Sequence, residues 1–212
     1  SQYRRYRRTV WDLWGAAQAI NTGDSMFALA QMALADDRDT DPAVVLQAYQ
    51  ALNGACRSLC EGQFLDLDFE TRSLVPTEDY YGMIDRKTAA LLATSCYLGA
   101  LYGGASDSAV EEYRSFGRHL GLAFQIRDDY LGIWGDPKET GKPAADDVAS
   151  RKKTLPLLYA LATATGSDRA SMESFFAAKG PMGESDTAEI LAILDRCGAA
   201  ARTAREVEEQ SE

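Results

Sequence analysis

The segment FQIRDDYLGIWGD, residues 124–136, places two adjacent aspartates in an otherwise apolar stretch. Four of its residues stand at i, i+3, i+4 and i+7 and therefore share one face of a predicted helix. These are Gln125, Asp128, Asp129 and Gly132. Burying two neighbouring carboxylates costs free energy unless a cation neutralises them, and Mg²⁺ prefers such oxygen ligands. A solvated Asp-Asp pair near a helix end is the alternative, and a bare pair by itself favours that alternative.

The composition predicts an all-α protein. The chain has 212 residues, which suffices for one domain with a hydrophobic core. It contains only 6 prolines, and no strand-like alternation is sustained over several segments. A net charge of −10 argues against nucleic acid as a partner. The most apolar run, residues 89–102, is too short to cross a bilayer, and we find no signal peptide.

The cysteines predict reduced thiols rather than a metal site. Cys56 and Cys60 stand at i, i+4 on a predicted helix, and no histidine lies nearby to complete a zinc site. Buried reduced thiols suit a cytoplasmic protein, which is the location that we expect. The only histidine, His119, lies in the middle of a predicted helix, and we expect a structural role for it.

The opening segment and its continuation resemble the second aspartate-rich motif of the trans-isoprenyl diphosphate synthases. These are the chain-elongating prenyltransferases related to farnesyl and geranylgeranyl diphosphate synthase. The family pattern is FQ-x-x-DD-x-x-D-x-x-GD, then GK, then a loop that ends in K-x-TLP. The chain departs from it at Gly132, where many members have a third aspartate. The matching residues are Phe124, Gln125, Asp128, Asp129, Gly135, Asp136, Gly141, Lys142, Lys152, Thr154, Leu155 and Pro156.

Two further motifs extend the resemblance. MIDRKTAAL, residues 83–91, is similar to the family's K-T-x-x-L, which implies that Lys87 reaches the allylic diphosphate and that Thr88 lies beside the reacting carbons. The arginine cluster near the N-terminus resembles RRG-x-P-T, which assigns Arg4 and Arg5 to the substrates' diphosphates. On composition alone the same cluster is typical of a disordered basic tail.

A third segment, GQFLDLDFE, aligns with the family's GQ-x-x-D. We expect Gln63 to belong to the wall of a cavity. Asp66 and Glu70 stand at i, i+4, but an acidic helix end is usually solvated, so we do not expect them to form a metal pair.

The resemblance implies an antiparallel helix bundle around a central cavity. It covers nearly all of this chain but only about the C-terminal two thirds of a family member. We therefore expect one isoprenyl-synthase-like domain over residues 1–212, truncated at its N-terminus, with the first aspartate-rich motif upstream of Ser1.

The implied activity is a prenyltransferase that condenses isopentenyl diphosphate with an allylic diphosphate, and the implied assembly is a homodimer. Positioned cations would stabilise the leaving diphosphate. The resemblance assigns Mg²⁺ to Asp128 and Asp129 and the diphosphate to Arg4, Arg5, Lys87, Lys142 and Lys152. The oxygens of Thr88 and Gln125 would stabilise the carbocation in a dry cavity.

Two other functions remain open. A terpene synthase or cyclase on the same scaffold would ionise the diphosphate without using isopentenyl diphosphate. A non-catalytic partner subunit of a prenyl synthase would fit the missing first motif and Gly132. The retained Arg4, Arg5 and Lys87 favour elongation, because these residues serve to position diphosphates.

The loop 137–153 contains no apolar side chain larger than Val148. We expect it to bury little surface and to be the least protected long segment outside the termini. Because it carries Lys142 and Lys152, it would act as a lid that closes when magnesium and diphosphate arrive. Asp146 and Asp147 would restrain these lysines in the free protein.

Overall fold

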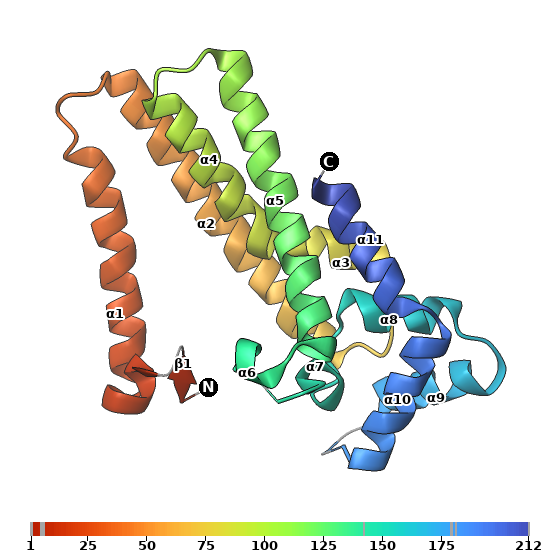
Figure 1. Ribbon diagram of the computed structural model, residues 1–212. Coiled ribbons are helices and arrows are strands. Elements are labelled where there is room, and N and C mark those ends of the chain that lie inside the picture. Colours follow the sequence, from red (N-terminus) through yellow and green to blue (C-terminus); the bar gives the residue numbers. More distant parts are fainter. Residues whose placement is uncertain (1, 5–6, 142, 179, 181, 212) are drawn as a thin grey trace. The chain divides into compact units, whose positions relative to one another are not determined.

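The computed structural model describes residues 2–4, 7–141, 143–178, 180 and 182–211. The described residues are almost entirely helical (Figure 1), which confirms the predicted all-α class. Contacts divide the chain into two compact units, Ser1–Asn53 and Gly54–Glu212, which we describe separately. The expectation of one domain stays a prediction. Within the described residues, no helix combines the length and the apolar character needed to span a membrane.

The first unit contains a short hairpin and two helical segments. Strand β1 (Tyr3–Arg4) pairs antiparallel with β2 (Arg7–Arg8), and helix α1 (Val10–Ala35) follows. Helix α2 (Pro42–Thr71) begins in this unit and continues into the second. Proline suits the first turn of a helix, and Asp41 Oδ1 accepts a hydrogen bond from the backbone N–H of Ala43 at 2.7 Å.

The second unit holds the end of α2 and the remaining elements. They are α3 (Thr77–Ile84), η1 (Asp85–Ala89), α4 (Ala90–Tyr102), α5 (Asp107–Trp134), α6 (Pro137–Thr140), α7 (Asp146–Ala149), α8 (Leu155–Thr163), α9 (Gly166–Ala177), α10 (Glu184–Arg196) and α11 (Ala199–Ser211). Element η1 is a π-helix. Such one-turn widenings of a helix are frequent at functional sites.

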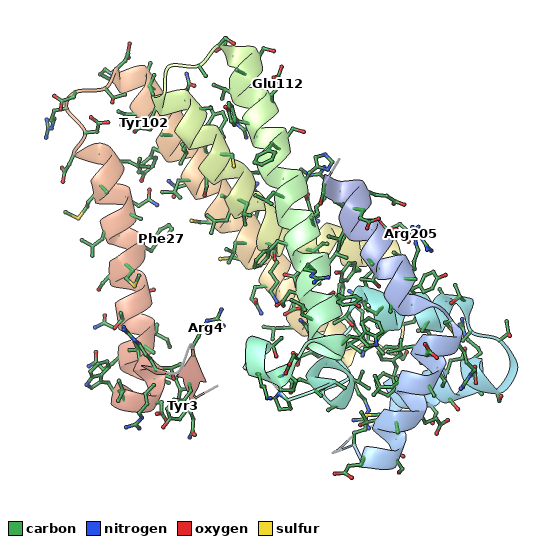
Figure 2. The ribbon with its side chains drawn as sticks, in the orientation of Figure 1. Tyr3, Arg4, Phe27, Tyr102, Glu112 and Arg205 are labelled. Carbon is green, nitrogen blue, oxygen red and sulfur yellow. The ribbon has the colours of Figure 1, made fainter. Side chains whose placement is uncertain are left out.

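Helices α4 and α5 run side by side in opposite directions (Figure 1), and Figure 2 shows Tyr102 and Glu112 at the same end of the pair. Two glycines of α5 permit this close packing. A Cβ atom on Gly117 would lie 2.7 Å from the Leu92 carbonyl oxygen, and one on Gly121 would lie 2.5 Å from Ala89 Cα. The neighbouring backbone therefore explains why glycine, which costs helix propensity, stands at both positions.

Helix α11 packs along α5 (Figure 1). His119 Nδ1 of α5 lies 3.0 Å from Gln210 Oε1 of α11, a contact consistent with the expected structural role. All four cysteines are unpaired, but the expectation that they are buried is wrong, because Cys60 is exposed and the other three are half-buried. Two clusters of buried apolar residues form the core, and the one beneath α3 and α5 includes Phe69, Tyr80, Ile84, Ile126 and Leu158.

The prediction for the loop 137–153 is wrong in its second half. Ala145, Asp147, Val148 and Lys153 are buried. The physical reason is a tertiary fit, because a Cβ atom on Gly132 would lie 2.5 Å from Asp147 Cγ. The small residue that replaces the family's third aspartate thus leaves room for the carboxylate of the loop.

We expect the amide hydrogens of residues 148–155 to exchange slowly in the free protein. The backbone N–H of Val148 donates to Ala145 O at 3.0 Å, and that of Lys152 donates to Asp147 O at 3.0 Å. Protection that appears only with magnesium and diphosphate should be confined to residues 136–144, where most described side chains are exposed. Hydrogen exchange with mass spectrometry measures the exchange of both segments, in the free protein and with magnesium and diphosphate. Fast exchange across residues 148–155 would contradict the buried arrangement.

Candidate active site

Two of the predicted site residues, Gln125 and Lys152, lie beside Asp129 of α5, which is only 1% exposed. Its Oδ2 accepts a hydrogen bond from Tyr80 Oη at 2.6 Å and another from the backbone N–H of Leu155 at 3.2 Å. Its Oδ1 accepts from Gln125 Nε2 at 3.1 Å. Asp129 therefore joins α3, α5 and the start of α8.

Lys152 is the charged partner of Asp129. Its Nζ lies 3.7 Å from Asp129 Oδ1 and 3.9 Å from Asp147 Oδ2. Burial alone would lower the pKa of Lys152, but the carboxylates of Asp129, Asp147 and Asp128 outweigh it and raise that pKa. Lys152 is therefore a cation at neutral pH.

Burial raises the pKa of Asp129, and Lys152 together with the three hydrogen-bond donors opposes this rise. Because every neighbour offers either a proton or a positive charge, the contacts stabilise the carboxylate form. Burial and the adjacent Asp129 charge also raise the pKa of Tyr80 well above its ordinary value, so its hydroxyl stays protonated and donates.

Thr88 and Gln125 form the next layer of the site. Thr88 Oγ1 donates a hydrogen bond to Gln125 Oε1 at 2.7 Å, while Gln125 Nε2 donates to Asp129. Both ends of the amide are thus engaged, which fixes the orientation of the Gln125 side chain. The structure brings these two residues together, and their role toward a substrate stays a prediction.

Lys87 of η1 approaches the same region from another side. Its Nζ lies 2.5 Å from Asp66 Oδ2 of α2, and Gly62 allows the contact because a Cβ there would lie 2.7 Å from Lys87 Cα. The Asp66 carboxylate also contributes to the raised pKa of Lys152. Asp66 and Lys152 both line a pocket of about 480 Å³. Asp66 is therefore the residue that both ammonium groups share, by a direct contact with Lys87 and by its charge acting on Lys152.

Asp128 differs from its neighbour. It is half-buried, and within the described part of the chain it makes no hydrogen bond or ion pair. It is close enough to help raise the pKa of Lys152. The described residues contain no group of three or more His, Cys, Asp or Glu side chains arranged to hold a metal. One available carboxylate nevertheless fits Mg²⁺, which usually completes its shell with water and phosphate oxygens.

The N-terminal assignments stay predictions. Arg4 is exposed in β1 of the first unit (Figure 2). Arg5 and Lys142 lie outside the described residues.

Sequence reasoning missed two participants. Tyr80 lies 49 residues from Asp129, and Asp66 lies 21 residues from Lys87, so no local spacing links either pair. Tyr80, Ile84 and Thr88 stand at i, i+4 and i+8. This spacing was the one available signal, because it places Tyr80 on the same helix face as Thr88, a predicted site residue. Together the site offers two ammonium groups and one available carboxylate, which can bind a diphosphate together with a divalent cation.

Known proteins are similar to most of this chain. The family model described as polyprenyl synthetase matches residues 1–194. The chain is 47% identical over 161 residues to a (2E,6E)-farnesyl diphosphate synthase of Mycobacterium bovis (strain ATCC BAA-935 / AF2122/97), covering 76% of this chain and 44% of that protein. The chain thus spans about half the length of the curated relatives that it matches.

Two solved structures are similar to nearly the whole of this chain. The crystal structure of polyprenyl synthetase from Streptomyces coelicolor A3(2) matches with a TM-score of 0.89 and 40% identity, covering 99% of this chain and 62% of that chain. The crystal structure of polyprenyl synthase from Caulobacter crescentus CB15, complexed with calcium and isoprenyl diphosphate, matches with a TM-score of 0.84 and 30% identity over 99% of this chain and 62% of that chain.

Proposed function

Because this chain belongs to the polyprenyl synthetase family, we propose that the protein containing it is a prenyltransferase. It condenses isopentenyl diphosphate with an allylic diphosphate and so makes a short-chain polyprenyl diphosphate. The observation that carries the proposal is the Lys152 ammonium beside the carboxylates of Asp128 and Asp129, with Lys87 bound to Asp66, whose charge also acts on Lys152.

The reaction needs charge stabilisation at the leaving group. The C–O bond of the allylic diphosphate breaks, and its electron pair leaves with the diphosphate. The alkene of isopentenyl diphosphate then attacks the allylic carbon, and a proton is lost to the diphosphate. Lys87 and Lys152 stabilise the negative charge that develops on the leaving oxygens.

A divalent cation supplies further neutralisation of the diphosphate when it is bound. Asp128 suits this ion as a ligand, whereas both oxygens of Asp129 already accept hydrogen bonds. We therefore assign the direct contact to Asp128 and an orienting role to Asp129. We propose Mg²⁺ as the ion. The calcium and isoprenyl diphosphate named for the Caulobacter enzyme support the pairing of a divalent cation with this class of substrate.

Thr88 and Gln125 act on the hydrocarbon end of the substrate. Their hydrogen bond presents a fixed pair of polar groups, which stabilise positive charge on the allylic carbons without offering a free nucleophile. Arg4, Arg5 and Lys142 complete the diphosphate contacts in this proposal.

The test uses radiolabelled isopentenyl diphosphate, geranyl diphosphate and Mg²⁺ with the complete gene product that carries this chain. We expect labelled prenyl diphosphates that are longer than geranyl. Consumption of geranyl diphosphate without incorporation of the label would identify a terpene synthase instead. No consumption would support a non-catalytic partner subunit.

We also propose a homodimer in the cytoplasm. Helix α1 has no buried residue, and large apolar side chains such as Trp14, Met26 and Leu29 are exposed on it, which favours a protein partner. The four unpaired cysteines suit a reducing compartment. Analytical ultracentrifugation of the complete gene product tests the dimer.

A further inference from the structure

Tyr80 carries a deeply buried hydroxyl group that the proposed reaction does not use. It lies in α3 and is 1% exposed, among apolar residues that include Phe69, Ile84 and Ile126. A phenol hydroxyl in such surroundings needs a hydrogen-bond partner. It donates to Asp129 Oδ2 at 2.6 Å, a distance typical of a hydrogen bond from a hydroxyl to a carboxylate.

We propose that Tyr80 is a positioning residue that acts through Asp129 on Gln125 and Lys152. This inference rests on the proposed function, because it assumes that those two side chains face the substrate. Its own basis is the hydrogen-bond geometry, which divides the two oxygens of Asp129 between different tasks.

The Oδ2 atom of Asp129 connects α5 to two other helices. It accepts from Tyr80 of α3 and from the backbone N–H of Leu155, the first residue of α8. Two donors from two separate elements set both the position and the rotation of the carboxylate. Oδ1 is then left to face Gln125 Nε2 at 3.1 Å and Lys152 Nζ at 3.7 Å.

This arrangement fixes the distance between the Lys152 ammonium and the Asp129 carboxylate. At 3.7 Å its ammonium is attracted by Asp129 without a direct hydrogen bond, so it remains able to donate to an incoming anion. Without the Tyr80 hydroxyl, Oδ2 would lose one donor. A buried carboxylate that lacks a donor recruits another, and Lys152 is the nearest cation. Drawing Lys152 into direct contact would withdraw it from the diphosphate and would also displace Gln125.

The test compares Tyr80→Phe with the wild-type chain in binding inorganic diphosphate in the presence of Mg²⁺, by isothermal titration calorimetry. We expect the affinity to fall by about 10-fold or more, the effect typical of a lost hydrogen bond to a charged group. Tyr81→Phe is the matched control. Tyr81 is the next residue of α3, and its hydroxyl likewise donates to a carboxylate, Glu206 Oε2 of α11, at 2.8 Å. The substitution Tyr81→Phe should leave the diphosphate affinity unchanged.

A double variant tests the route through Asp129. In the background of Asp129→Asn, the change Tyr80→Phe should alter the affinity by less than about 2-fold, because the partner through which it acts has already been changed. Independent, additive losses from the two substitutions would overturn the proposal.

A second readout needs no ligand. The side-chain amide signals of Gln125 in a ¹⁵N-labelled sample should shift in Tyr80→Phe and stay in place in Tyr81→Phe, whereas a merely structural loss would affect both variants alike. Unchanged Gln125 signals together with unchanged affinity would overturn the inference. A wild-type chain that fails to bind diphosphate with Mg²⁺ would count against the proposed function, and the Gln125 signals would then decide the positioning role by themselves.

Discussion

Asp128→Asn is expected to lower the turnover of the complete enzyme by about 100-fold or more while the melting temperature changes little. Asp128 is half-buried and makes no hydrogen bond or ion pair in the described part of the chain, so its charge contributes little to folding. In the proposed function the same charge holds the cation that neutralises the leaving diphosphate. Such charge stabilisation is worth several kcal/mol, and about 1.4 kcal/mol corresponds to tenfold in rate.

The measurement pairs steady-state kinetics with thermal unfolding. Asp195→Asn, at an exposed aspartate of α10, serves as the control and should change neither quantity. Mg²⁺ titration adds a direct readout, since Asp128→Asn should require a higher Mg²⁺ concentration to bind inorganic diphosphate. A large drop in melting temperature with normal turnover per folded molecule would instead make Asp128 a structural residue.

Gly62→Ala is expected to reduce both stability and diphosphate binding. The added Cβ would lie 2.7 Å from Lys87 Cα, a separation that real side chains do not adopt, so α2 and η1 must move apart. Overpacking of this kind typically costs about 1–3 kcal/mol of unfolding free energy. Because the clash falls on the backbone of Lys87, it should also break the 2.5 Å contact with Asp66 and misplace the ammonium.

Chemical denaturation and calorimetry with inorganic diphosphate and Mg²⁺ measure the two effects of Gly62→Ala. Gly99→Ala is the opposite case, because Gly99 lies in α4 and a Cβ atom added there would meet nothing within 4 Å. It should raise stability by up to about 1 kcal/mol through helix propensity and leave binding unchanged. Normal diphosphate affinity in Gly62→Ala would show that Lys87 does not depend on this close packing.

The helices of the second unit were largely predictable because their signals are local. The predicted helix that carries Asp128 and Asp129 is α5 (Asp107–Trp134), with Ser106 as its N-cap accepting from the Ala109 N–H at 3.4 Å. The helix predicted around Cys56 and Cys60 is α2, which begins at Pro42. In both cases a capping residue and an apolar period lie within the segment that they define.

The loop 137–153 was mispredicted because its burial depends on residues that are distant in the sequence. Its composition contains little that would bury itself, yet Val148 is fully buried and Asp147 nearly so. What covers them is supplied from elsewhere in the chain, including the space that Gly132 leaves for Asp147. Burial is a property of the partners that a segment meets, so the segment's own residues could not reveal it.

The sequence by itself determined the helical class and the family, because motif order and periodicity are written along the chain. Only the tertiary structure decided how the two adjacent aspartates divide their tasks. Asp128 and Asp129 are neighbours of the same type, but a rotation of about 100° per residue around the helix turns one toward the available space and the other into the core. There Asp129 meets Tyr80 from α3 and the Leu155 N–H from α8. Residues 49 and 26 positions away thus give identical side chains different surroundings, and only folding brings them together.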